Sequence, residues 1–317
     1  MLIDAPDWAT RHHYYHHSNP RSKDRAKALY EKVHVRPQIN AAWNTIRNDD
    51  ANDNDKILAR NVITRLSDNR SNSAMEAGKS VQLATDLHLV PDEFDTTLSL
   101  PEAIEAATRS LNQYTVQNYN DTVRENDNAK KEKYLEELPH VIDHAVMGLQ
   151  EAMRLDNRIV GEIDLIDTLP GNAVPHFTKP DYGRRGDLKT KWSRMSSKSK
   201  SGWQANSLPK NLNGMFDRNN LYQVAGFWAL NGHQPPWLVY ANATDYRILD
   251  QNNCVELRDD SLHEIVKDMA MQHKITENIL RAASSKEELL GLVSPDWNAI
   301  YWNEPPTYLD EAKQLWE

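Results

Sequence analysis

The sequence contains one cysteine, Cys254, among 317 residues, so the chain cannot form an intrachain disulfide. It also lacks any apolar run approaching the roughly 20 residues that a membrane-spanning helix needs. Its first residues, MLIDAPDWATRHHYY, show no basic start followed by an apolar stretch, the pattern of a secretory leader. We therefore expect no membrane segment and no export, and a reducing cytoplasm fits best. The composition, 39% hydrophobic and 26% charged, is ordinary for a globular protein.

Positive charge is scarce overall, because 37 Lys and Arg face 46 Asp and Glu, giving a formal net charge of −9. Residues 175–210 depart from this balance, and we call them the basic window. Nine basic residues minus two acidic ones leave +7 there, and therefore −16 in the remainder. Such an asymmetry is expected where a phosphate backbone is held against an otherwise anion-repelling surface; a solvated basic loop is the plainer alternative. The basic members are Lys179, Arg184, Arg185, Lys189, Lys191, Arg194, Lys198, Lys200 and Lys210, opposed by Asp181 and Asp187.

Hydrophobic periodicity predicts a mixed α/β chain. Helices are expected over 22–33, 74–89, 101–118, 130–154, 219–230 and 261–283, the last opening on the capping-box spacing of Ser261 and Glu264. Strands are expected over 158–166, 185–192, 237–241 and 246–249, and a loop over 48–55. We expect an amino-terminal helical part over 1–73, a core over 74–250 and a carboxyl-terminal helical part over 251–317, unless all three form one domain.

Two of the predicted strands carry residues suited to hydrolytic chemistry. Because side chains alternate along a strand, Asp187 and Lys189 share one face while Leu188 points into the core. The same rule puts Glu162 and Asp164 on one face of the preceding strand. If the two strands pair, carboxylates and one ammonium group converge. Carboxylate oxygens hold Mg²⁺ or Mn²⁺, which polarises a phosphate and activates water, and a lysine stabilises the developing charge.

Four motifs then resemble one family. Gly161-Glu-Ile-Asp164 and Gly186-Asp187-Leu-Lys189 resemble the G-x-x-D and D-x-K elements of PD-(D/E)xK nucleases, in the branch of RecB-type and phage lambda-type exonucleases. The segment 221–227 resembles the Q-x-x-x-Y helix of that branch, and 77–86 resembles its first helix, G-x-x-x-H-x-x-x-E. The motifs occur in the family's order. The resemblance implies a restriction-endonuclease-like core: a small mixed sheet flanked by helices, with helical elaborations at both ends.

The resemblance also implies roles for individual residues. Asp164 and Asp187 would bind Mg²⁺ or Mn²⁺, with the backbone carbonyl of Leu188 as a third ligand. Lys189 would act on the phosphate or the attacking water, and Gln223 would contact phosphate or orient the lysine. The expected DNA contacts are Arg184, Arg185, Lys191, Arg194, Lys198 and Lys200.

The chain departs from the family pattern in three places. Gln82 and Asp86 replace the usual His and Glu of the first helix, so they are either metal ligands or a polar helix face. Phe227 replaces the usual Tyr. Finally, 22 residues separate Asp164 from Asp187, and this long insertion is either a clamp over DNA or a plain loop.

The function implied is divalent-metal-dependent, exonucleolytic hydrolysis of DNA, in phage recombination, replication or host-genome degradation. The expected partners are DNA and other replication or recombination proteins, with no membrane, in the host cytoplasm. An endonuclease or nickase of the same fold is the first alternative. A DNA-binding module without catalytic activity is the second.

Overall fold

The computed structural model describes residues 15–16, 30, 34–48, 50–66, 72–91, 97–115, 121–154, 161–197, 199–213, 218–297 and 306–316. The chain divides into two compact units. Unit 1 comprises Met1–Asn69, Thr168–His176 and Lys267–Glu317, and unit 2 comprises Arg70–Asp167 and Phe177–Val266. Unit 2 contains all four family-like motifs. It begins close to the expected boundary at 73, but it continues past 250 and omits 168–176.

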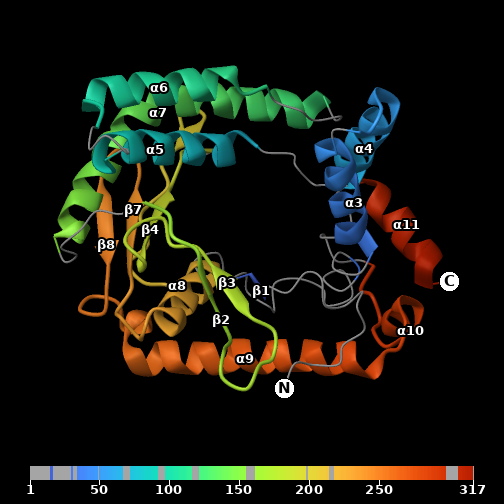
Figure 1. Cartoon of the computed structure of the whole chain (residues 1–317). Helices are drawn as coiled ribbons and strands as arrows, with labels where there is room; N and C mark the ends of the chain where they lie inside the picture. The colour runs from blue at the N-terminus through green and yellow to red at the C-terminus, as the bar shows by residue number, and fades with distance from the viewer. Residues whose placement is uncertain are drawn as a thin grey trace. The chain divides into compact units, whose positions relative to one another are not determined.

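Three helices open unit 2: α5 (Ser73–Leu89), α6 (Leu100–Gln113) and α7 (Asp121–Met153). They pack against one another (Figure 1) and confirm the helices predicted from periodicity, except that α6 ends at Gln113 and not at 118. The start of α6 is fixed locally, because Glu102 accepts a hydrogen bond of 3.0 Å from the backbone N–H of Ser99 and Pro101 occupies the first turn. α7 begins earlier than expected, and it contains Pro139.

The central sheet of unit 2 has the order β4-β7-β8. Strands β4 (Gly186–Thr190) and β7 (Trp237–Ala241) run parallel, and β8 (Tyr246–Leu249) pairs antiparallel with β7. All five residues of β7 are buried, as is usual for a strand covered on both faces. The expected pairing of 185–192 with 158–166 is wrong for the described residues, because 161–164 form no strand, 165–167 lie in another sheet, and β4 pairs with β7.

Helix α8 (Arg218–Leu230) supplies the crossover that a parallel pair requires between β4 and β7. It lies on the opposite face of the sheet from α7, because the Asn220 side chain donates to the Tyr240 hydroxyl at 2.7 Å. The sheet thus sits between a helical layer and α8. The same unit contains the short strands β2 (Leu165–Asp167), β5 (Arg194–Met195) and β6 (Trp203–Gln204), and β3 (His176–Thr178) neighbours β2 at the unit boundary.

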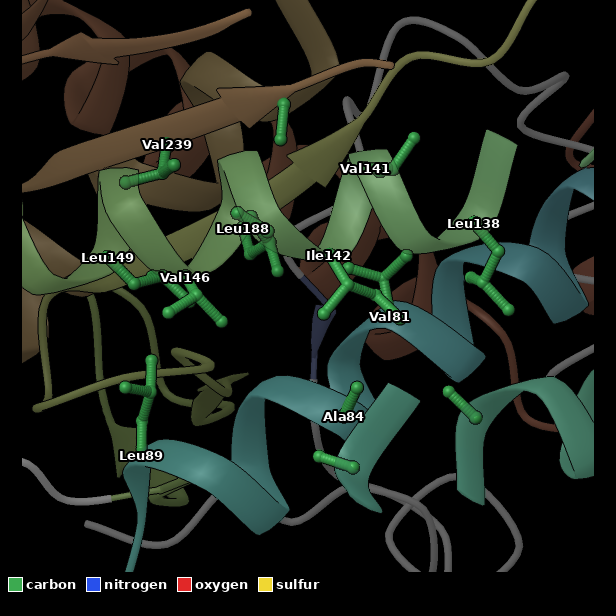
Figure 2. Packing of buried hydrophobic residues seen from close by; sticks show 14 of the residues in the cluster. Val81, Ala84, Leu89, Leu138, Val141, Ile142, Val146, Leu149, Leu188 and Val239 are labelled. Atoms are coloured by element: carbon green, nitrogen blue, oxygen red, sulfur yellow. The ribbon is translucent and has the colours of Figure 1, made fainter. Parts of the chain in front are cut away.

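The main core of unit 2 lies between α5, α7 and the sheet. Figure 2 shows Leu188 of β4 and Val239 of β7 among the apolar side chains of α7, with Val81 of α5 close by. Gly148 lets α7 approach the sheet, because a Cβ there would lie 2.7 Å from Val239. Packing therefore takes up one face of β4 and leaves the other to polar side chains.

Unit 1 is mainly helical. Its elements are β1 (Tyr15–His16), α3 (Arg36–Arg47), α4 (Asp53–Leu66), α10 (Lys286–Gly291) and α11 (Pro306–Trp316). α4 begins inside the segment 48–55 that was predicted as a loop, and Asn52 accepts a hydrogen bond of 2.9 Å from the Asp55 N–H. The helix predicted over 22–33 lies outside the described residues except for Tyr30, which is buried in the unit 1 core.

Helix α9 (Asp259–Ala282) follows the short 3-10 helix η2 (Val255–Leu257), and the unit boundary falls within it. It starts two residues before Ser261, so the predicted capping box is wrong. The Ser261 hydroxyl instead donates to the Val255 carbonyl at 2.9 Å. Within the part of the chain that the structure describes, no helix is both long enough and apolar enough to span a membrane.

Candidate active site

Strand β4 carries two of the predicted site residues on its polar face. Asp187 is fully buried, and its Oδ2 atom forms an ion pair with the ammonium group of Lys189. Leu188 points the other way into the core, with 8% of its surface exposed. The arrangement agrees with the alternation predicted from the sequence.

Helix α8 contributes Gln223, which is also buried. Its side-chain Nε2 donates a hydrogen bond of 2.8 Å to Oδ1 of Asp187. Both carboxylate oxygens of Asp187 are thus engaged, one by an amide and one by an ammonium group. Such contacts fix the orientation of a carboxylate before any ligand arrives.

A second carboxylate, that of Asp181, lies against the same strand. Its Oδ2 accepts a hydrogen bond of 3.0 Å from the backbone N–H of Leu188. A tight turn makes this contact possible, because Tyr182 and Gly186 exchange backbone hydrogen bonds of 3.1 and 2.8 Å. The two residues at the tip, Gly183 and Arg184, have φ angles of 57° and 71°, in the left-handed region.

The two aspartates and Lys189 are coupled electrostatically. Burial, and then the negative charge of Asp187, hold the pKa of Asp181 well above its usual range. Burial by itself lowers the pKa of Lys189, but the carboxylates of Asp187 and Asp181 outweigh it and raise that pKa above its ordinary value. We call Asp181, Asp187, Lys189 and Gln223 the carboxylate site. Its two acids outnumber its single cation, so it favours a further positive charge.

Asp181 was treated in the sequence only as a charge opposing the basic window, so its place in this site was missed. A signal was present, because Pro180 and Asp181 form the Pro-Asp pair of a P-D-x5-D-x-K pattern that ends at Lys189. The G-x-x-D motif drew attention to Asp164 instead.

Asp164 lies elsewhere. Residues 161–164 are irregular, and β2 begins only at Leu165, so the strand argument for Glu162 and Asp164 is wrong. The Asp164 side chain is 60% exposed and lies 4.0 Å from the ammonium group of Lys179, which forms an ion pair with Glu162. Among the described residues, no hydrogen bond or ion pair joins Asp164 to Asp187 or Lys189.

The two uncertain residues of the first helix belong to this neighbouring group, which we call the Lys179 cluster. Gln82 donates a hydrogen bond of 3.0 Å to Glu162. Asp86 accepts one of 2.8 Å from the hydroxyl of Tyr182, the residue after Asp181. Burial raises the pKa of Asp86 to about 6, the Tyr182 hydrogen bond lowers it, and the charge of Glu162 raises it further. The cluster adjoins the carboxylate site through the Asp181–Tyr182 peptide.

The donor set of the carboxylate site is suited to a hard divalent cation. The backbone groups of Arg185 and Lys191 hydrogen-bond to β7. In β4, the N–H and C=O groups of the odd-numbered residues therefore point toward that strand. The carbonyl of Leu188 therefore points with its N–H toward Asp181 and the open edge. Two carboxylates and one carbonyl are oxygen ligands of the kind Mg²⁺ takes together with water. No group of three or more His, Cys, Asp or Glu side chains arranged for a metal occurs within the described ranges.

The residues of the basic window precede, include and follow β4 along the chain. Arg184 is exposed at the tip of the turn, whereas Arg185 donates to the Pro235 carbonyl at 3.0 Å. The ammonium group of Lys191 lies 5.4 Å from the centre of the Tyr240 ring. Arg194 and Lys200 are exposed beyond the end of β4, and Lys198 lies outside the described residues.

Comparisons of the chain with protein-family models, curated proteins and solved structures gave no match. The geometry of the site and the short motifs are therefore what indicates its chemistry. Fold-level analogy alone would be a weaker guide to function.

Proposed function

We propose that the protein is a divalent-metal-dependent deoxyribonuclease that hydrolyses phosphodiester bonds, with the carboxylate site as its active centre. The observation that carries the proposal is the placement of Asp181, Asp187 and Lys189 at one strand edge, with Gln223 bonded to Asp187. The buried carboxylate of Asp187 lies beside the partly buried one of Asp181, although bringing like charges together out of water costs stability. Such an arrangement is typical of a site kept for chemistry.

Each residue of the carboxylate site would have its own role in hydrolysis. Asp181, Asp187 and the Leu188 carbonyl would hold Mg²⁺ or Mn²⁺, which supplies Lewis acidity and lowers the pKa of bound water. Lys189 would donate hydrogen bonds to the phosphate as negative charge develops on it. Gln223 keeps the Asp187 carboxylate aimed at the edge of β4. Asp86 and Asp164, in the adjoining cluster, remain candidate ligands of a neighbouring divalent cation.

The charge of the basic window and the resemblance of the motifs both favour DNA as the substrate. The basic window supplies phosphate contacts on a chain of net charge −9. Exonucleolytic digestion, and a place in phage recombination, replication or host-genome degradation, follow from the motifs shared with lambda-type and RecB-type enzymes. We keep these as parts of the proposal.

The test is digestion of end-labelled single- and double-stranded DNA with Mg²⁺ or Mn²⁺. Wild type should release labelled products, whereas Asp187→Asn and Lys189→Met should be slower by about 10²-fold or more. Asp310→Asn and Lys313→Met, on exposed positions of α11, are matched controls for the loss of one charge. Intact DNA with wild type in both metals would refute the enzyme proposal.

Covalently closed circular DNA separates the modes of cleavage. An exonuclease spares the closed circle and degrades the same DNA after linearisation. Nicking or linearisation of the circle would instead assign an endonuclease. A DNA-binding module without activity would bind equally well with Asp187→Asn and cleave neither substrate.

A further inference from the structure

A small pocket of unit 2 lies between the start of α8, the helix η2 and the first turns of α9 (α8 and α9 are labelled in Figure 1). Its volume is about 190 Å³. Leu212, Leu221 and Ile265 give it apolar walls. Glu256 and Arg218 also line it, so the same small space contains two charges of opposite sign. We call it the Glu256 pocket.

The carboxylate of Glu256 is the buried polar group of this pocket. Only 8% of the residue's surface is exposed. Its Oε2 accepts a hydrogen bond of 3.1 Å from the Cys254 thiol, whereas its Oε1 is buried and has no hydrogen-bond partner among the described residues. A buried carboxylate oxygen without a partner costs stability unless a donor reaches it. The pocket therefore presents one fixed acceptor to the N–H group of a ligand.

The guanidinium group of Arg218 restricts what that ligand can be. Arg218 is exposed at the first position of α8, and it makes no hydrogen bond to Oε1 of Glu256. It would repel a cationic amine or a basic side chain, and it would attract an anionic group. Within the described ranges the pocket also lacks the three acidic, His or Cys side chains that would hold a metal ion. The ligand that fits joins an N–H donor to an anionic group.

The size of the pocket limits the ligand further. Its volume is below the roughly 300 Å³ at which sites for drug-sized ligands begin, so it admits one small ring and no longer chain. Water molecules alone are the plainer occupant, because each takes about 30 Å³ of liquid volume. The three apolar walls offer such waters few hydrogen bonds, which favours a ligand that has an apolar body.

Helix α8 connects the pocket with the carboxylate site. Leu221 is a wall of the pocket, and Gln223 donates to Asp187 at 2.8 Å. Two positions along a helix point about 200° apart, so the two residues lie on nearly opposite sides of α8. An exonuclease that cleaves beside Gln223 would release nucleoside monophosphates on the other side of this helix. Such a product has a small ring, N–H donors and a phosphate.

We propose that the Glu256 pocket binds a nucleoside monophosphate released by the enzyme, with a preference for cytosine. The N4 amino group of cytosine donates to Oε1 of Glu256, and the phosphate binds Arg218. Thymine has the O4 carbonyl in place of that amino group, and two acceptors would then face each other. The choice of a nucleotide rests on the proposed nuclease function. A free amino acid also combines N–H donors with an anionic group, so the test includes one.

The first measurement is isothermal titration calorimetry of wild type in EDTA, where no DNA is hydrolysed. The titrants are dCMP, dTMP, deoxycytidine and leucine. We expect dCMP to bind, and dTMP to bind at least about tenfold more weakly, which is the discrimination of one base-edge hydrogen bond. Deoxycytidine should also bind at least about tenfold more weakly, because it lacks the phosphate.

Variants assign the two ends of the ligand. Glu256→Gln should weaken dCMP binding by at least about tenfold and remove the preference over dTMP, whereas Glu132→Gln, exposed on α7, should behave as wild type. Arg218→Met should weaken dCMP to the level of deoxycytidine and leave deoxycytidine binding unchanged. Arg154→Met, on an exposed residue just beyond α7, is its matched control.

Several results would overturn the proposal. One is no heat of binding up to about 1 mM dCMP, the result expected if the pocket holds only water. Equal affinities for dCMP and dTMP are a second. Loss of dCMP binding in Lys189→Met would place the nucleotide in the carboxylate site, and binding of leucine without dCMP would assign an amino acid. Because Arg218 is exposed, Arg218→Met tests the idea even if Glu256→Gln fails to fold.

The two proposals fail in different ways. Binding of dCMP that depends on Glu256 and Arg218, without hydrolysis of DNA in either metal, overturns the nuclease and leaves the pocket as a nucleotide site. Hydrolysis of DNA by a protein that binds none of the four titrants supports the nuclease and overturns the nucleotide pocket.

Discussion

Gln223 and Asp187 are joined by a buried hydrogen bond of 2.8 Å, although 36 positions separate them in the chain. The bond ties α8 to β4 at the point where β4 carries its acid and its lysine. The crossover helix therefore does more than connect two parallel strands, because it sets the direction of a candidate ligand.

Truncation of Gln223 should loosen Asp187. We expect Gln223→Ala to reduce hydrolysis by about 10–100-fold, the usual cost of losing a group that orients a ligand, and to raise the Mg²⁺ concentration needed. Rates measured across a Mg²⁺ series check this. Gln234→Ala, on an exposed loop, is the control. A rate equal to wild type at every Mg²⁺ concentration would contradict the role.

Replacement of Asp181 should raise the stability of the protein and lower its activity. The folded-state pKa of Asp181 lies above its unfolded value, so its ionisation opposes folding as pH rises. Asp181→Asn should therefore raise the free energy of unfolding at neutral pH by about 0.5–2 kcal/mol, and the gain should vanish in acid, where both states hold the proton. Hydrolysis should fall sharply.

Urea denaturation of metal-free protein at several pH values measures this effect. The amide oxygen can still accept the Leu188 N–H, so the turn is kept. A destabilised Asp181→Asn protein at neutral pH would show that the carboxylate is a net structural support.

Gly186 should tolerate no side chain. A Cβ at this position would lie 2.1 Å from the Trp237 ring in the neighbouring strand. We expect Gly186→Ala to lower the free energy of unfolding by about 3 kcal/mol or more, because the indole cannot move out of a packed core. Chemical denaturation checks the loss, and Trp237→Leu in the same chain should recover part of it. Additive losses in the double variant would rule out the clash as the cause.

Cys254 should be unreactive in the native protein. Its thiol is buried and donates to Glu256 at 3.1 Å, and burial, followed by Glu256, raises its pKa to about 12. Reaction with iodoacetamide at pH 8 should be at least about a hundredfold slower than in denaturant, because the thiolate is the reacting form. The raised pKa also means that the thiol's contribution to stability is present below the unfolded pKa and is lost as pH rises further. Equal rates in native and unfolded protein would contradict this burial.

The sequence was sufficient for the elements but not for their pairing. Hydrophobic periodicity predicted α5, α8 and β7 to within a residue or two, because burial of an element imposes this periodicity on its own local sequence. It could not show that β4 pairs with β7, since pairing depends on contacts between distant segments. Asp164 was placed beside Asp187 through the wrong pairing.

Asp181 was missed for a different reason, which is a local backbone conformation. It reaches the site through a turn in which Arg184 adopts a left-handed conformation, uncommon for an arginine. Composition gives no hint of that conformation. Asp187 and Lys189 could be placed on one face because strand alternation is a property of the backbone itself.

The contact between Asp181 and the Leu188 N–H also bears on solubility. β4 is the outer strand of the order β4-β7-β8 among the described strands, and an outer strand offers unpaired backbone groups to other chains. The Asp181 carboxylate already occupies the Leu188 donor, and Asp187 and Lys189 place charges beside it. Groups that we assign to catalysis therefore also oppose extension of the sheet into aggregates. A natural loss of the acids would remove the activity and also the protection of the β4 edge against pairing with other chains.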